Sequence, residues 1–311
     1  MSIVVTGGSG FLGRTLVRTA LAQHQRVVVM DRRRWPESGA PPAGMTMLTG
    51  ELTAPTDAMR AALREAEAVV HLAGCPGVRD AGPDVAFRRQ RDNVDAARSV
   101  LAATPLATPT VVLSSSSVYG GLPAGPTGPP GHRTLREDDP LRPRGGYARS
   151  KVATERVCAE RAAVGGHALV VRPFTVLGEG QRADMAVSRW AHEARSTGHV
   201  TVLGSPERTR DLTDVREVAR CLTALVASGR VGTVNLGTGQ GHTLAQLATA
   251  VCAAVGIPTQ LRTVPAAHSE VEHTAADTTR LRDWTGRVPV THLADAVARA
   301  VASLPSTRVA A

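Results

Sequence analysis

The chain has 311 residues, of which 42% are hydrophobic and 20% are charged, and its formal net charge at pH 7 is +9. This length and apolar content suffice for one large core with a smaller lobe, so the sequence predicts a globular protein. A positive charge of this size can indicate nucleic-acid binding, but aromatic residues make up only 3% and no stacking or zinc-finger pattern accompanies the arginines. We therefore expect no nucleic-acid partner, and a surface that attracts a small anionic ligand.

Membrane insertion, disulfide bonding and metal binding are also disfavoured. No apolar run approaches the roughly 18 residues that cross a bilayer, and no basic leader precedes the strand-like start of the chain, so we expect a cytoplasmic protein without a membrane partner. The four cysteines lie far apart and form no CxxC pair, which favours reduced thiols. The ten histidines form no cluster at metal-ligand spacing, so no metal is predicted.

Short apolar segments alternate with amphipathic, helix-like stretches from the first residue to about residue 172. The predicted buried strands are Ile3–Thr6, Val27–Asp31, Met45–Leu48, Ala68–Leu72, Thr110–Ser114 and Ala168–Arg172. This alternation is typical of α/β proteins, in which helices cover both faces of a parallel sheet. The sequence predicts a Rossmann-type, doubly wound parallel sheet.

After about residue 172 the predicted strands become sparser. A Gly- and Pro-rich segment, Gly120–Gly131, is predicted to be a surface loop, because the alternation resumes after it. Helices such as Asp214–Leu225 and Thr243–Val255 then dominate. We expect a dinucleotide-binding domain over residues 1–171 and a smaller C-terminal α/β substrate lobe over residues 172–311, from which some segments return to the first domain.

A glycine-rich segment, TGGSGFLG, directly follows the first predicted strand and precedes a helix-like stretch. Gly7, Gly10 and Gly13 let the backbone turn sharply and approach a pyrophosphate, whose charge then meets the helix N-terminus. Asp31 ends the second predicted strand about 18 residues later, close to the spacing of the acids that bind the adenosine ribose hydroxyls. This arrangement predicts a dinucleotide site.

The charge pattern after the second strand favours NAD over NADP. The Asp31 carboxylate would accept hydrogen bonds from a free 2′-hydroxyl group and would repel a 2′-phosphate. Arg32, Arg33 and Arg34 follow directly and can bind such a phosphate. The sequence therefore leaves NADP as the less favoured alternative.

The chain contains one lysine, Lys151, and it lies four residues after Tyr147, one of only two tyrosines. If Tyr147 begins a helix, the two side chains lie one turn apart on the same face. A catalytic base near neutral pH requires the pKa of tyrosine to fall by about three units, or roughly 4 kcal/mol. We predict Tyr147 as the base, with Lys151 and an oxidised nicotinamide ring together supplying the stabilising charge.

These motifs resemble the extended short-chain dehydrogenase/reductase family, in particular its nucleotide-sugar epimerases. The matching segments are TGGSGFLG, HLAG at 71–74, SSSSVYGG at 114–121, YARSK at 147–151, RPFTVLGEGQRADMA at 172–186, RTRDLTDV at 208–215 and NLGTG at 235–239. The resemblance implies that Ser115 hydrogen-bonds the reacting sugar oxygen. It implies these cofactor residues: Gly7, Gly10, Phe11, Leu12, Gly13, Asp31, Arg32, Glu51, Leu52, Leu72, Ala73, Gly74, Asn93, Tyr147 and Lys151.

Ser116 and Ser117 bear on the reaction that the resemblance implies. The family's 4,6-dehydratases carry an Asp-Glu pair at these positions, because removing a C5 proton and expelling the C6 hydroxyl require an acid and a base. Its decarboxylases typically carry Glu at the second position. Serines are typical of the 4-epimerases, which are isomerases that oxidise C4 transiently to a 4-keto intermediate with bound NAD. Alternatively the two serines only cap a strand end; Ser116 is also a candidate substrate contact.

The segments Arg172–Thr175 and Gln181–Ala186 most resemble UDP-glucuronate 4-epimerases, as does Arg79 after the fourth strand. A 4-keto uronate is a β-keto acid that loses carbon dioxide easily. Thr175 and Arg182 are therefore predicted to hold the C5 carboxylate in an orientation that resists this loss. Alternatively, Arg182 binds the pyrophosphate or lies at the surface.

The resemblance also bears on the nucleotide and on assembly. Arg210 resembles the family arginine that binds the substrate pyrophosphate, whereas Ala267–Glu270 departs from the family's usual Arg-Pro-Gly-Asp sequence and leaves the nucleotide base open. Family members often dimerise through two helices, here about Asp84–Ala102 and Tyr147–Ala163. The resemblance thus implies a nucleotide-sugar substrate and a homodimer.

Three other functions remain open at this stage. An NAD(P)H-dependent reductase of NDP-4-keto sugars would use the same Tyr and Lys, with Arg32 and Arg33 at the 2′-phosphate. An epimerase of a neutral NDP-hexose would need no carboxylate contact. A non-catalytic dinucleotide sensor is disfavoured, because such relatives usually lose the Tyr or the Lys.

Overall fold

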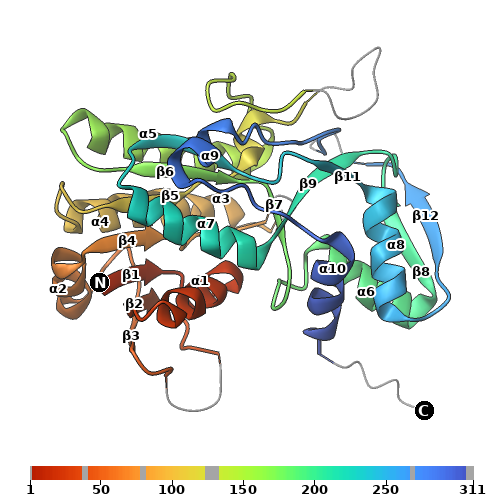
Figure 1. The fold of residues 1–311 in the computed structure, drawn as a ribbon, viewed down its shortest axis with the longest axis horizontal. Coiled ribbons are helices and arrows are strands. Elements are labelled where there is room, and N and C mark those ends of the chain that lie inside the picture. Colours follow the sequence, from red (N-terminus) through yellow and green to blue (C-terminus); the bar gives the residue numbers. More distant parts are fainter. Residues whose placement is uncertain (1, 37–40, 78–81, 123–132, 267–269, 306–311) are drawn as a thin grey trace.

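A computed structural model describes residues 2–36, 41–77, 82–122, 133–266 and 270–305. A large sheet is covered by helices on both faces, and a smaller group of helices and strands lies beside it (Figure 1). Among the described residues, no helix is long and apolar enough to cross a bilayer. Nor do three His, Cys, Asp or Glu side chains gather there in a way that would hold a metal ion.

The large sheet contains seven parallel strands among the described residues, in the order β10-β6-β5-β4-β1-β2-β3. The strands are Ser2–Thr6 (β1), Arg26–Asp31 (β2), Met45–Thr49 (β3), Ala68–His71 (β4), Thr110–Leu113 (β5), Leu169–Pro173 (β6) and Gly232–Leu236 (β10). Each of the six predicted buried strands is present. The predicted α/β fold with a parallel sheet is confirmed.

The sheet forms because its strands are apolar on both faces. Val4, in the middle of β1, is fully buried and pairs with Val28 of β2 and Val69 of β4. Strand order reverses between β1 and β4, since β2 and β3 lie on one side and β5, β6 and β10 on the other. In such sheets a crevice opens at the carboxyl ends of the strands where the order reverses.

The helices on the two faces bury separate apolar clusters against the sheet (Figure 1). One face carries α1 (Phe11–Ala22), α7 (Val215–Ser228) and α9 (Thr279–Thr285); the other carries α2 (Asp57–Glu65), α4 (Ala96–Ala103) and α5 (Gly145–Ala163). The short α3 (Val85–Arg89) and a π-helical turn, Gln90–Asp95, lead into α4. Strand β10 is part of the large sheet, and α7 and α9 pack against it, although all three follow residue 172.

A second apolar core lies in the smaller lobe, where Trp190, Val200, Leu247 and Val297 pack together. Its elements are β7 (Thr175–Leu177), α6 (Ala186–Thr197), β8 (His199–Leu203), β9 (Thr209–Asp214), β11 (Gly241–Thr243), α8 (Leu244–Val255), β12 (Gln260–Val264) and α10 (Leu293–Ala302). Strand β6 runs across the predicted domain boundary at residue 171, and the division itself stays a prediction. Residues 123–131 of the predicted surface loop lie outside the described residues.

His71, at the carboxyl end of β4, is a buried titratable group in the large core. Its Nδ1 lies 2.7 Å from the hydroxyl of Thr6 on β1. Burial lowers the pKa of His71 to about 3, and the charge of Lys151 acts in the same direction. The folded protein therefore holds this imidazole neutral at pH values where the unfolded chain protonates it.

This difference predicts acid sensitivity. The contribution of His71 to the free energy of unfolding is fully present above about pH 6.5. It is lost as the pH falls toward 3, with a slope of up to about 1.4 kcal/mol per pH unit. Replacing His71 with Gln, which can still hydrogen-bond Thr6, should flatten the pH dependence of the unfolding free energy in this window. Urea unfolding at several pH values between 4 and 7 measures this pH dependence, and His192→Gln, at an exposed position, is the control. Equal slopes in both variants would contradict the prediction.

Candidate active site

The glycine-rich turn between β1 and α1 has no room for a side chain at Gly7 or Gly13. A Cβ on Gly7 would lie 2.7 Å from the backbone nitrogen of Ala73, and one on Gly13 would lie 2.2 Å from the carbonyl oxygen of Gly7. Gly7 also has φ +70. Helix α1 starts at Phe11, and its N-cap, Gly10, makes no side-chain cap. The uncapped first turn therefore offers backbone N–H groups of the kind that bind a phosphate.

Asp31 is held in place at the carboxyl end of β2. Its two carboxylate oxygens accept hydrogen bonds from the backbone N–H groups of Ser9, at 3.1 Å, and Arg33, at 3.0 Å. The Ser9 bond ties the acid directly to the glycine-rich turn. Together, the glycines that leave no room for side chains, the uncapped helix and this carboxylate fit a dinucleotide with a free adenosine ribose.

Arg32 is bound to other side chains beside this site. Its guanidinium lies 2.7 Å from Asp92 and 3.9 Å from Glu51. Burial opposes ionisation of Asp92, but hydrogen bonds from Arg91 and Arg32 outweigh it and hold the pKa of Asp92 below its usual range. Since a 2′-phosphate would have to compete with these carboxylates for Arg32, the arrangement favours NAD over NADP.

A cavity of about 1540 Å³ opens at the carboxyl ends of the strands, between the large sheet and the smaller lobe. Single-ligand pockets usually measure about 300 to 1,000 Å³, so this one has room for a dinucleotide and a second ligand. The predicted site residue Arg79 lies outside the described residues. The others line this cavity: Gly7, Gly10, Phe11, Leu12, Gly13, Asp31, Arg32, Glu51, Leu52, Leu72, Ala73, Gly74, Asn93, Ser115, Ser116, Tyr147, Lys151, Thr175, Arg182 and Arg210.

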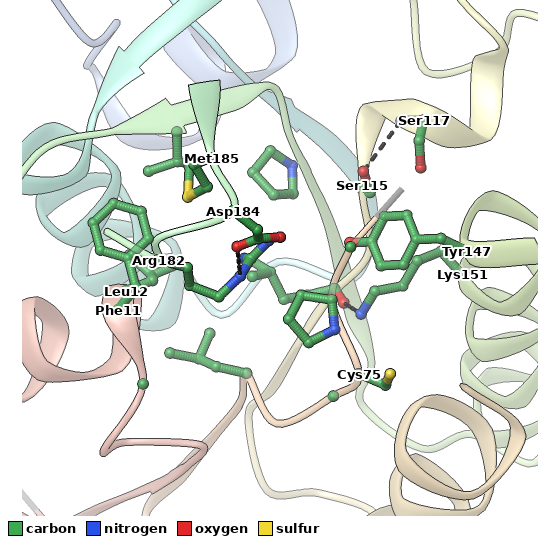
Figure 2. Close-up of a pocket in the computed structure, with 18 of the residues that line it drawn as sticks. Phe11, Leu12, Cys75, Ser115, Ser117, Tyr147, Lys151, Arg182, Asp184 and Met185 are labelled. Atoms are coloured by element: carbon green, nitrogen blue, oxygen red, sulfur yellow. Dashed lines mark hydrogen bonds and ion pairs between the residues drawn. The ribbon is translucent and has the colours of Figure 1, made fainter. Parts of the chain in front are cut away.

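Tyr147 and Lys151 reach into the cavity from the first turns of α5 (Figure 2). The helix predicted around them is present and begins at Gly145. Lys151 is only 6% exposed, and its Nζ donates a hydrogen bond to the carbonyl oxygen of Leu113, at 2.8 Å. Burial lowers the pKa of Lys151 to about 8, so the ammonium form still dominates at neutral pH.

The environment of Tyr147 acts in two directions. Burial raises the pKa of its phenol, while a hydrogen bond with the Ser115 side chain and the charges of Arg182 and Arg89 work against that rise. The net shift is upward in the chain alone. The fall in pKa that a catalytic base needs therefore requires further positive charge in the cavity, as expected when an oxidised nicotinamide ring is bound.

The serine run places hydroxyl groups on the cavity wall. Ser115 caps a short turn, Ser116–Tyr119, because its Oγ accepts a hydrogen bond from the backbone N–H of Ser117 at 3.2 Å. The Oγ of Ser117 is buried and has no hydrogen-bond partner within the part of the chain that the structure describes. A buried hydroxyl without a partner is costly, so Ser117 is a candidate ligand contact. The sequence pattern predicts a cap at a strand end or a replacement for a carboxylate at Ser117, but not a ligand contact.

Asn93 connects the cavity floor to α5. Its Oδ1 accepts a hydrogen bond from the backbone N–H of Cys75 at 2.7 Å, and its Nδ2 donates to the Ser150 hydroxyl at 2.8 Å. The side-chain amide thus joins the loop after β4 to the helix that carries Tyr147. Any contact between Asn93 and a cofactor would add to these bonds.

Arg182 reaches toward Tyr147 in the cavity (Figure 2). Its Nε and Nη2 donate to the two carboxylate oxygens of Asp184, at 2.8 and 2.9 Å. Gln181 fixes the loop that carries Arg182, since its side chain bonds the Gly178 backbone and the hydroxyl of Ser188. No pattern in the sequence predicts this pairing with Asp184.

Arg210 is held at the lobe side of the cavity. Its Nη1 donates to the carbonyl oxygens of Thr209, at 2.8 Å, and Glu272, at 3.2 Å, and its Nη2 lies 3.6 Å from the Glu270 carboxylate. The neighbouring Asp211 is fully buried, and its carboxylate accepts three backbone hydrogen bonds. Strand β9 therefore presents Arg210 from a rigid support. Of the segment Ala267–Glu270, only Glu270 is among the described residues.

Comparisons with known proteins agree with this geometry. The solved structure described as MoeE5 in complex with UDP-glucuronic acid and NAD is 30% identical, with a TM-score of 0.83, over 97% of this chain and 98% of that one. The UDP-glucose 4-epimerase of Mycolicibacterium smegmatis is 29% identical over 97% of each chain. The dTDP-6-deoxy-L-talose 4-dehydrogenase of Kitasatospora kifunensis is 29% identical over 95% of this chain and 93% of the relative.

A family model for NAD-dependent epimerases and dehydratases matches residues 3–237, which is more than half of the chain. The match begins at β1 and includes the glycine-rich turn, Asp31, Ser115, Tyr147 and Lys151. The predictions of an enzyme of the extended short-chain dehydrogenase/reductase type and of NAD as its cofactor are confirmed. The chain belongs to the NAD-dependent epimerase/dehydratase family.

Proposed function

We propose that the chain is a nucleotide-sugar 4-epimerase that interconverts UDP-glucuronate and UDP-galacturonate. The observation that carries the proposal is that Tyr147, Ser115 and Arg182 line one cavity, in which Arg182 acts electrostatically on the phenol. A proton-transferring group and a carboxylate-binding group thus lie within reach of one sugar ring. The likeness to MoeE5, whose solved complex contains UDP-glucuronic acid and NAD, supports this choice of substrate.

The reaction assigns a separate task to each side chain. Tyr147 takes the proton from the sugar O4. It returns a proton to O4 after the 4-keto sugar has rotated and presents its opposite face to the cofactor. Ser115 orients that oxygen by a hydrogen bond, and Lys151 keeps a positive charge in the same cavity from its fixed place on the Leu113 carbonyl. NAD, when bound, would accept the hydride from C4 and later return it, so the sugar undergoes no net oxidation.

The cavity wall favours epimerisation over elimination. Ser116 and Ser117 stand where the family's 4,6-dehydratases carry their acid and base, and a hydroxyl group cannot take the place of either at neutral pH. Without such a pair, neither loss of the C5 proton nor departure of the C6 hydroxyl is assisted. Return of hydride and proton to C4 is then the favoured course of the reaction.

The Arg182 guanidinium and the Thr175 hydroxyl would hold the uronate carboxylate. Both line the cavity, and the bonds of Gln181 fix the loop that carries Arg182. A charge-assisted contact would keep the carboxylate out of the orientation from which a β-keto acid loses carbon dioxide. A neutral NDP-hexose would gain nothing from this contact, which distinguishes the two kinds of substrate.

Purified enzyme supplied with UDP-glucuronate should form UDP-galacturonate, observed by proton NMR. Tyr147→Phe should lower turnover by about 1000-fold, because the group that carries the O4 proton is lost, and should leave the melting temperature unchanged. Epimerisation of UDP-glucose alone would reject the uronate assignment. Turnover that consumes NADPH with a 4-keto sugar would reject epimerisation.

Arg182→Gln should discriminate between charged and neutral substrates. Removing the guanidinium should raise the KM for UDP-glucuronate by about tenfold or more, the usual effect of losing a charge-assisted hydrogen bond, and should leave binding of UDP-glucose unchanged. Arg230→Gln, at an exposed position after α7, is the matched control. Equal losses for both sugars would instead place Arg182 at the pyrophosphate.

We also propose that the enzyme is a homodimer that assembles through α4 and α5. These helices lie side by side, with Arg98 of one paired to Glu160 of the other at their exposed side. Phe87 of α3 is 67% exposed near this surface. Multi-angle light scattering should give twice the chain mass, and Phe87→Glu should shift the protein toward the monomer. A wild-type monomer would contradict the proposal.

A further inference from the structure

We propose that Glu155 is a positioning residue that holds Ser115 and Lys151 in their places through a buried network of hydrogen bonds. The catalytic meaning of that placement rests on the proposed function. Glu155 lies on α5 one turn after Lys151, outside the cavity lining. Neither the sequence motifs nor the mechanism above uses it.

The first connection runs from Glu155 to the end of β5. The Ser114 hydroxyl donates to Glu155 Oε1 at 2.5 Å, and Ser114 is only 2% exposed. Ser114 stands between Leu113, whose carbonyl oxygen accepts the hydrogen bond of Lys151, and Ser115, which faces Tyr147. A shift of Ser114 would therefore move both catalytic contacts together.

The second connection fixes the carboxylate itself. Arg172 of β6 binds it with both branches of its guanidinium, Nε to Oε1 at 2.9 Å and Nη2 to Oε2 at 2.7 Å. The side chains are 6% and 11% exposed, respectively. Burial disfavours the charged guanidinium, but the bonds to Glu155 outweigh it and raise the pKa of Arg172 above its usual range. Such a pair cannot be loosened without exposing a buried charge.

Arg172 is in turn anchored on its far side. Its Nη1 donates to the Tyr119 hydroxyl at 2.8 Å and to the carbonyl oxygen of Glu137 at 2.9 Å. The Tyr119 hydroxyl donates to the Asn235 side chain of β10 at 2.7 Å. The network thus joins α5, the end of β5, β6 and β10. It fixes the spacing between the helix that carries Tyr147 and Lys151 and the strand end that carries Ser115.

The network also has an electrostatic effect on the catalytic lysine. Lys151 faces Glu155 and Cys158 from its own helix, Cys75 from the loop after β4, and His71 from β4. Glu155 and the two cysteines raise the pKa of Lys151, against the lowering by burial, and the charge of Lys151 lowers the pKa of His71. The titration of Lys151 therefore reports on the placement and the charge of Glu155.

The chain's lone lysine makes this measurable without signal assignment. Full-length, NAD-loaded enzyme labelled with carbon-13 at lysine Cε gives one lysine signal, whose pH titration follows Lys151. Ser114→Ala removes the connection to β5 and leaves the ion pair with Arg172, whereas Glu155→Gln removes the charge. Ser228→Ala, at the end of α7, and Glu65→Gln, an exposed glutamate at the end of α2, are the matched controls.

Glu155→Gln should lower the titration midpoint of Lys151, and Ser114→Ala should shift its signal. Both should lower kcat by about tenfold and leave KM within about twofold, since misplacement of catalytic groups affects the reaction more than binding. If both variants keep the control values of signal and kcat, the network is only structural and the proposal is wrong. Should Glu155→Gln fail to fold, Ser114→Ala decides alone.

Failure of the proposed function would look different. A wild-type enzyme that interconverts no nucleotide sugar rejects the epimerase assignment, while the Lys151 signal still tests the positioning, because it needs no substrate. If the wild type is active, and Glu155→Gln and Ser114→Ala change neither the Lys151 signal nor kcat, only the role of Glu155 is rejected.

Discussion

The hydrogen bond between the Lys151 ammonium and the Leu113 carbonyl is the contact on which the rest of the site depends. It holds a positive charge where burial opposes one, and it does so with a backbone acceptor that the parallel sheet presents at the end of β5. A guanidinium in this place would need several acceptors in a plane, whereas an ammonium is compact and satisfied by few. This explains why a chain that uses arginine for every other basic position has a lysine here.

Helix α5 can present Tyr147 and Lys151 to the cavity because its other sides are tied down. Ser150 accepts a hydrogen bond from the Asn93 side chain, and the hydroxyl of Thr154 donates to the Asn93 carbonyl oxygen at 2.9 Å. That carbonyl belongs to the π-helical turn Gln90–Asp95, in which the usual helical bonds are rearranged. The irregular turn and the Glu155 network therefore secure different sides of the same helix.

Features that depend on short stretches of sequence could be predicted, whereas contacts between distant residues could not. Three features each involve only a few neighbouring residues: the strands rich in Val and Ile, the glycine spacing before α1, and the pair Tyr147 and Lys151. Each lies in the element where the sequence predicts it. The pairing of Ser114 with Glu155 joins residues 41 positions apart, and that of Arg32 with Asp92 joins two different elements. Such groups come together only through the order of the strands in the sheet, so no local sequence pattern predicts these contacts.

Carboxylates beside the arginines of the cavity determine how an anionic ligand can bind. Arg182 is paired with Asp184, Arg210 lies near Glu270, and Arg32 is bound by Asp92. A ligand phosphate or carboxylate must therefore replace or share an existing partner, so its net gain in free energy is smaller than that of binding a bare charge. Selectivity then depends on which pairs the ligand's geometry allows it to break. The half-exposed pair of Arg182 and Asp184 is easier to open than the pair that holds Arg32 to the buried Asp92. Under the function proposed above, Arg182 therefore discriminates between substrates, while the cofactor end of the cavity stays constant.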